Sequence, residues 1–142
     1  MIVNKLHYFL LLSVLFLSCN SHTTENYDNY LNGYWEIKEV TTRDGVTKSY
    51  NYNPTIDFIE IGDSSGIRKK LQPRLDGTFI TSKDQEFFTI KHKNDSLILY
   101  YQTSLDEWQE NILHINENEL IVKNENGSIY KYKRYEKLNI EE

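Results

Sequence analysis

Apolar and polar residues alternate along short segments of the chain from residue 34 onward. Near the start, Trp35 and Ile37 alternate with Glu36 and Lys38. A period of two places successive side chains on opposite faces of a β-strand, so each such segment has one buried and one wet face. The segments are also rich in Ile, Tyr, Phe, Val and Thr, which favour strands. The pattern therefore predicts an all-β domain.

Turn residues separate these segments at regular intervals, as at Asp76-Gly77 and Asn126-Gly127. Short strands joined by tight turns are typical of an antiparallel meander. Ten strands are expected, over residues 34–41, 46–50, 56–61, 67–74, 78–82, 86–92, 97–103, 108–115, 119–123 and 129–135.

Eight to ten sequential strands of this kind form either a sandwich or a closed barrel. Consecutive short hairpins favour an antiparallel up-and-down barrel, because a sandwich of this size usually needs longer crossovers. A barrel of about eight strands either is filled by side chains or holds one small ligand. The fold class alone therefore leaves binding and no binding both open.

The first residues have the pattern of a removable export signal. Lys5 lies in a short polar start, residues 6–17 are almost entirely apolar, and Ser18 precedes Cys19. This apolar run is shorter than the roughly 20 residues of a permanent membrane-spanning helix. We therefore expect a signal peptide over 1–18, a flexible tether over 19–30, a barrel over 31–137 and a disordered tail over 138–142.

The end of this signal, Leu15-Phe16-Leu17-Ser18-Cys19, resembles the bacterial lipoprotein box. The resemblance implies that the Cys19 thiol receives a diacylglycerol before cleavage, and that palmitate or a related acyl chain anchors the protein. Two or three acyl chains on one residue suffice for stable attachment to a membrane. The predicted location is the bacterial cell envelope, with the outer membrane favoured and the leaflet left open.

The two ends of the predicted barrel carry a recognisable pair of motifs. Asn32-Gly33-Tyr34-Trp35 heads the first strand, and Arg134 lies in the last one. Together with the meander between them, these residues resemble the Gly-x-Trp motif and final-strand arginine of lipocalins, as in the lipocalin-like (calycin-like) domains of small bacterial lipoproteins. The resemblance implies that Trp35 closes one end of the barrel, with Gly33 beside it and Arg134 stacked over the indole.

Composition and charge exclude several classes of protein. The 142 residues include 16 Lys and Arg against 21 Asp and Glu, for a net charge of −5, and no basic stripe is present. Such a chain is a poor nucleic-acid binder. His92 and His114 fall on separate predicted strands, and no spacing resembles a metal site, a nucleophile elbow or a phosphate loop. We expect no catalytic residue, no metal and no cofactor.

Eleven tyrosines are the most unusual feature of the composition. A tyrosine has an apolar ring and one polar tip, so several around a cavity suit an amphipathic ligand. The candidate ligand-binding residues are Tyr100, Tyr101, Tyr130 and Tyr132. Core and interface tyrosines are also common in β-proteins, which leaves a purely structural role open for them.

Two charged clusters are candidate functional features. Asp106, Glu107 and Glu110 surround Trp108, as an acid pair beside an aromatic platform would, but a solvated strand end explains them more simply. Residues 67–74 form the one basic cluster, with Arg68 at its start. We interpret this segment as a charged outer face rather than as a contact for anionic headgroups or an acidic partner.

The sequence predicts a non-enzymatic, lipid-anchored envelope protein whose lipocalin-like barrel binds or carries a small hydrophobic or amphipathic molecule. The alternative is a protein–protein interaction module, such as an inhibitor, an immunity-type protein or an assembly accessory, that uses its acidic surface. A cavity of roughly 300 Å³ or more would support the first hypothesis. A filled barrel with an exposed aromatic patch would support the second.

Overall fold

The computed structural model describes residues 27–94 and 96–137, beginning with a short helix, α2 (Tyr27–Leu31). The predicted signal peptide, the Cys19 junction and the tail over 138–142 lie outside these residues. Among the described residues, no helix is long and apolar enough to cross a membrane.

Ten strands follow α2 in chain order. Their bounds are β1 (Gly33–Thr41), β2 (Thr47–Ser49), β3 (Ile56–Ile61), β4 (Ser65–Pro73), β5 (Phe79–Thr81), β6 (Glu86–Lys93), β7 (Ser96–Gln102), β8 (Glu107–Ile115), β9 (Glu119–Asn124) and β10 (Ile129–Arg134). All pairings between them are antiparallel.

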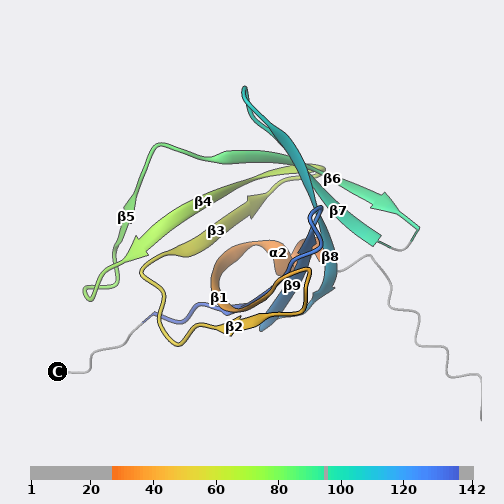
Figure 1. Cartoon of the computed structure of the whole chain (residues 1–142). Helices are drawn as coiled ribbons and strands as arrows, with labels where there is room; N and C mark the ends of the chain where they lie inside the picture. The colour runs from red at the N-terminus through yellow and green to blue at the C-terminus, as the bar shows by residue number, and fades with distance from the viewer. Residues whose placement is uncertain (1–26, 95, 138–142) are drawn as a thin grey trace, which may run out of the picture.

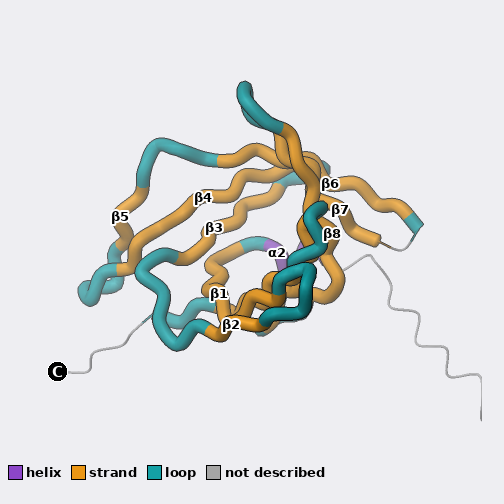
Figure 2. The backbone as a smooth tube through the Cα atoms, viewed as in Figure 1, coloured by secondary structure: helices purple, strands orange, loops and turns teal. Residues whose placement is uncertain are grey.

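Eight of these strands close into a barrel in the order β1, β3, β4, β6, β7, β8, β9 and β10. Closure comes from β10, which pairs with β1 from Trp35 opposite Arg134 to Thr41 opposite Ile129. Figures 1 and 2 show this ring, with α2 inside it and the β6–β7 and β7–β8 hairpins projecting outward. The predicted all-β, up-and-down barrel is confirmed.

The two remaining strands lie outside the ring. β2 pairs with the end of β1, and β5 pairs with the last residues of β4. Besides β3, β4 pairs with two strands: its first residues, Ser65–Arg68, pair with β6, and its last, Leu71–Pro73, pair with β5. With one neighbour each, β2 and β5 are three residues long, shorter than the segments predicted for them.

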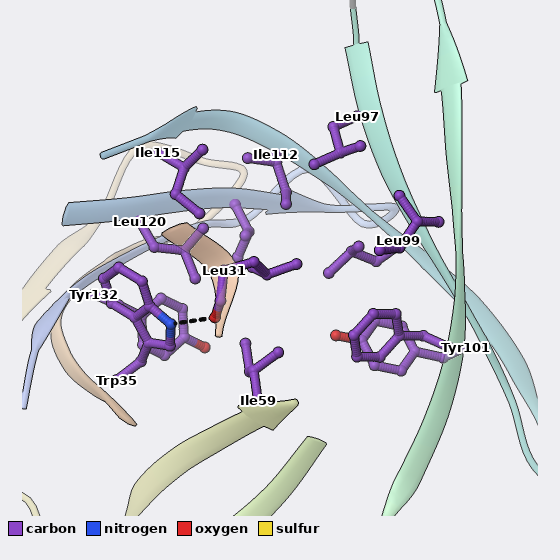
Figure 3. Close-up of a cluster of buried hydrophobic side chains, with 13 residues drawn as sticks. Leu31, Trp35, Ile59, Leu97, Leu99, Tyr101, Ile112, Ile115, Leu120 and Tyr132 are labelled. Carbon is purple, nitrogen blue, oxygen red and sulfur yellow. Dashed lines mark hydrogen bonds between the residues drawn. The ribbon is translucent and has the colours of Figure 1, made fainter. Parts of the chain in front are cut away.

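Inward-pointing side chains fill the ring. The buried cluster comprises Leu31, Trp35, Ile59, Phe88, Ile90, Leu97, Leu99, Tyr101, Ile112, Ile115, Leu120, Val122 and Tyr132. Figure 3 draws this cluster around the end of α2, with Leu31 between Trp35 and the leucines of β7. Cluster members on β6, β7 and β9 share one parity within each strand, as the alternation predicts. On β8 the register shifts between Ile112 and His114, so that both Ile112 and Ile115 face the core.

Candidate functional site

A guanidinium group lies inside the barrel, surrounded by acidic and phenolic groups. Arg68 of β4 bonds through Nη2 to Asp57 Oδ2 at 2.8 Å and through Nη1 to Glu110 Oε2 at 3.2 Å. Its Nη2 also donates to the Tyr132 hydroxyl at 2.8 Å, and its Nη1 donates to the Tyr101 hydroxyl at 3.4 Å. We call these five residues the Arg68 cluster.

Asp57 also forms an ion pair with Lys70, whose side chain is largely exposed. The Lys70 ammonium lies 2.5 Å from Asp57 Oδ1, and its own side chain is 63% exposed. Burial alone would raise the pKa of Asp57, but Arg68 and Lys70 outweigh it and hold the pKa below its ordinary value. Asp57 is therefore ionised at neutral pH.

The pKa values of Tyr101, Tyr132 and Arg68 are shifted as well. Burial raises the pKa of Tyr101 and of Tyr132 well above the ordinary value for a phenol, so both hydroxyls stay neutral. Burial would lower the pKa of Arg68, but the surrounding phenols and carboxylates raise it above its ordinary value. The cluster is a hydrogen-bonded polar core, in which the buried Arg68 Nε has no hydrogen-bond partner among the described residues.

This interior has no room for a ligand. The cavity that remains beside the Arg68 cluster has a volume of about 10 Å³, bounded also by Trp35, Ile59 and Leu99. That volume is about one water molecule. The barrel is thus filled by its own side chains, one of the two outcomes that the fold class left open.

Next to the cluster, four residues of successive strands lie opposite one another. Gly66 of β4 pairs with Phe88 of β6, Phe88 pairs with Tyr101 of β7, and Tyr101 pairs with Trp108 of β8. The Tyr101 and Trp108 rings are parallel within 4°, with centroids 4.9 Å apart, and the Phe88 ring is tilted against Tyr101 at 5.3 Å. The three rings form a continuous aromatic row.

The position of the Phe88 ring in this row requires glycine at position 66. A Cβ at position 66 would lie 2.5 Å from Phe88 Cζ and 2.6 Å from the backbone oxygen of Glu60. Since real Cβ atoms do not approach so closely, only glycine lets the Phe88 ring rest on the β4 backbone.

The aromatic row borders a groove of about 870 Å³ along β4, β6, β7 and β8, which we call the aromatic groove. Phe87, which is 57% exposed, and Tyr100 add two further rings to its wall. Tyr101 borders both the groove and the interior cavity. This volume is within the range of small-molecule sites, which are mostly apolar with a few polar groups.

The four tyrosines named from the sequence separate into two pairs. Tyr100 and Tyr101 line the aromatic groove. Tyr132 lies in the Arg68 cluster, and Tyr130 packs against the core while its hydroxyl accepts a bond from Asn124 at 3.4 Å. Two further tyrosines pack against phenylalanines: Tyr34 stacks on Phe79 and is tilted against Phe58, and Tyr135 meets Phe79 edge-on.

Trp35 and Arg134 lie together near α2. Trp35 is fully buried, and the Arg134 guanidinium carbon is 3.7 Å from the centre of its ring. Gly33, at φ +118°, lies so close that a Cβ there would be 2.9 Å from Arg134 Nη1. The left-handed φ and the close approach both require glycine at position 33.

The two charged clusters differ from the expectation of a solvated surface. Arg68 has a side chain only 11% exposed, and Glu110 is buried, so the prediction of a charged outer face was wrong for Arg68 and that of a wet strand end was wrong for Glu110. Glu107 does lie exposed, accepting a bond from Gln102 at 2.7 Å. For Glu110 the missed signal was parity, because it shares the parity of Trp108. Arg68 gave no such signal, because the apolar Ile67 and Leu71 of its strand have the opposite parity.

A second, wider groove of about 1300 Å³ lies on another part of the surface. Loops form most of it, around Tyr52 and Leu75, together with the chain from Lys133 onward. Its described lining residues include none of the aromatic row and none that borders the interior cavity. Among the described residues, no group of three or more His, Cys, Asp or Glu is placed to hold a metal ion.

A comparison with family profiles assigns the architecture. The profile of the lipocalin-like domain matches residues 31–122, which is most of the barrel. The chain belongs to the lipocalin-like domain family. In this lipocalin-like chain, the matched segment includes the Gly-x-Trp motif, the aromatic row and every member of the Arg68 cluster except Tyr132.

Solved structures with the same kind of fold are distant in sequence. A lipocalin-like protein from Bacteroides uniformis is 11% identical, with a TM-score of 0.47, over 74% of this chain and 98% of that one. Lobster apocrustacyanin A1 is 13% identical, with a TM-score of 0.46, over 82% of this chain and 67% of that one. A search of curated protein sequences found no match to this lipocalin-like chain.

Proposed function

We propose that this lipocalin-like protein binds or carries a small hydrophobic or amphipathic molecule in the aromatic groove and catalyses no reaction. The observation that carries the proposal is the groove itself, about 870 Å³ in volume and walled by the Phe88, Tyr101 and Trp108 rings. Aromatic walls exclude water from an apolar ligand and hold flat groups by stacking.

The filled interior supports this placement. A ligand has no access to the cavity of about 10 Å³ beside Arg68, whereas Tyr101 presents its ring to the groove and its hydroxyl to Glu110. The bond to Glu110, at 3.2 Å, keeps the ring in one orientation. The Arg68 cluster thus supports the wall of the site from behind.

The proposed site of action is the cell envelope, with Cys19 as the lipid-bearing residue. The lipoprotein-box pattern before Cys19 supports this part of the proposal. The anchor would keep the ligand-binding barrel at a membrane surface, where hydrophobic molecules are exchanged.

Blocking the groove tests the proposal. Thr89 lines the groove with an exposed side chain, so Thr89→Trp places an indole in it without disturbing the core. The matched control, Thr47→Trp, changes an exposed strand position outside the groove. We expect the neutral probe N-phenyl-1-naphthylamine to bind the native protein and the control, and to bind Thr89→Trp at least about tenfold more weakly, a loss of about 1.4 kcal/mol. Equal binding to all three proteins would contradict the proposed site.

A further inference from the structure

The charged side chains of the aromatic groove are mostly acidic. Among the described residues that line it, Glu60, Glu107 and Glu125 are carboxylates with exposed side chains, and Lys91 is the one cation. The Lys91 ammonium lies over the Tyr100 ring, 4.5 Å from its centre. Three negative charges against one positive charge give the groove an excess of two negative charges at neutral pH.

The interior behind the groove adds no positive charge to it. Arg68 is held between Asp57 and Glu110 by contacts of 2.8 and 3.2 Å, so its guanidinium is committed to two carboxylates. The Tyr101 hydroxyl, which separates Arg68 from the groove wall, donates to Glu110 at 3.2 Å. A ligand carboxylate in the groove would therefore face unpaired negative charge, with Lys91 as its one counterion among the described lining residues.

The aromatic walls of the groove, like its carboxylates, attract cations. The face of an aromatic ring carries partial negative charge and attracts cations, by about 0.5 to 2 kcal/mol. The Phe87 ring leaves more than half of its surface exposed, and the Tyr100 and Trp108 side chains are partly exposed. Aromatic faces combined with nearby carboxylates are the chemistry that recognises organic ammonium groups.

We propose that the aromatic groove selects amphipathic organic cations, an alkyl or aryl ammonium, over carboxylates of the same size. The apolar part of such a ligand packs on the Phe87, Tyr100 and Trp108 rings, which keep exposed surface in the groove, and its ammonium lies towards Glu60, Glu107 and Glu125. This inference rests on the proposed function, because it names the class of molecule that the same groove takes.

Three probes with one chain length separate charge from hydrophobicity. They are decyltrimethylammonium, decanoate and decyl glucoside, each titrated calorimetrically into the folded barrel below the concentration at which it forms micelles. At low salt we expect the cation to bind at least about tenfold more tightly than decanoate, with the neutral glucoside between them. Raising the ionic strength to about 0.5 M shortens the Debye length to a few ångströms and narrows the difference.

A pair of charge-matched variants assigns the preference to the groove. Glu60→Gln/Glu107→Gln/Glu125→Gln neutralises the three groove carboxylates. Asp84→Asn/Glu117→Gln/Glu136→Gln makes the same change in net charge at exposed positions outside the groove. We expect the preference for the cation to fall below about threefold in the first variant and to persist in the second, because screened charges act over about 10 Å.

The outcomes are distinct for the two proposals. Binding of decyl glucoside without a preference for the cation, or a preference that survives in the groove variant, would overturn the charge selectivity and leave the binding function standing. Tighter binding of decanoate than of the cation would also overturn the charge selectivity, and the binding function would stand. Failure of all three probes to bind would overturn both proposals.

Discussion

The Arg134 guanidinium covers the Trp35 indole and at the same time joins the barrel to α2. Its three nitrogens donate to the carbonyl oxygens of Glu117, Asn32 and Tyr30 at 2.8 to 2.9 Å. Trp35 Nε1 donates to the carbonyl of Leu31 at 2.9 Å. Three successive carbonyls at the end of α2 are thus satisfied by these two side chains, where a helix otherwise leaves them unpaired.

Removing either side chain should loosen this end of the barrel. Trp35→Ala should lower the free energy of unfolding by about 3–5 kcal/mol, because a large buried ring is lost. Arg134→Lys keeps a cation over the indole but loses the fork that reaches three carbonyls, and should cost about 1–3 kcal/mol. Chemical denaturation measures both. A loss below about 1 kcal/mol for Trp35→Ala would show that the ring does not close the barrel.

In the Arg68 cluster, a single substitution should destabilise the fold, whereas a combined substitution should restore most of the stability. Arg68→Met leaves Asp57 and Glu110 buried without their cation and should lower the free energy of unfolding by about 3–5 kcal/mol. Adding Asp57→Leu and Glu110→Met removes the stranded charges and should recover most of that loss.

A control for this series is Lys70→Met. Lys70 also pairs with Asp57, but its side chain is 63% exposed, so its removal should cost less than about 1 kcal/mol. A triple variant no more stable than Arg68→Met alone would mean that the carboxylates are not what makes the single change costly.

Stability should fall at both ends of the pH range. Because the pKa of Asp57 is lowered in the folded state, its contribution is present above the unfolded value of about 3.9 and is lost as the pH falls through the folded pKa. Tyr101 and Tyr132 have raised pKa values, so their contribution is complete below the unfolded value of about 10 and is lost as the pH rises above it.

Absorbance titration of the phenols checks the alkaline limb. In the folded protein, Tyr101 and Tyr132 should ionise only together with unfolding, as monitored by circular dichroism. Tyr101→Phe should remove part of this coupling. Ionisation of all tyrosines near pH 10 with the fold intact would contradict the described burial.

Part of this molecule could be predicted from the sequence. Period-two alternation and turn residues specify strands whatever the long-range contacts are, so the barrel was predicted with nearly all of its strands. Glu110 and Arg68 were misjudged because charged residues are usually exposed. Glu110 shares the parity of Trp108, but Arg68 lies on the strand face opposite to Ile67 and Leu71, so its burial depends on long-range contacts. The row from Gly66 to Trp108 depends on the register of four strands, which no local pattern in the sequence states.

The lipid anchor is tested separately from the barrel. Cys19→Ala removes the thiol that would carry the acyl chains, so the protein should move from the membrane fraction to the soluble envelope fraction. Cell fractionation followed by immunoblotting measures the change, with Thr47→Trp as a variant that keeps the thiol. Membrane association unchanged in Cys19→Ala would contradict the anchor.

The most direct test of ligand binding is the mass of the native protein. The processed protein would be extracted gently from its own envelope, and its native mass compared with its denatured mass. We expect a reproducible excess of a few hundred daltons beyond any acyl modification that persists after denaturation, and its loss in Thr89→Trp. Native protein without added mass, or with a second protein chain bound instead, would contradict the account of a small-molecule binding protein.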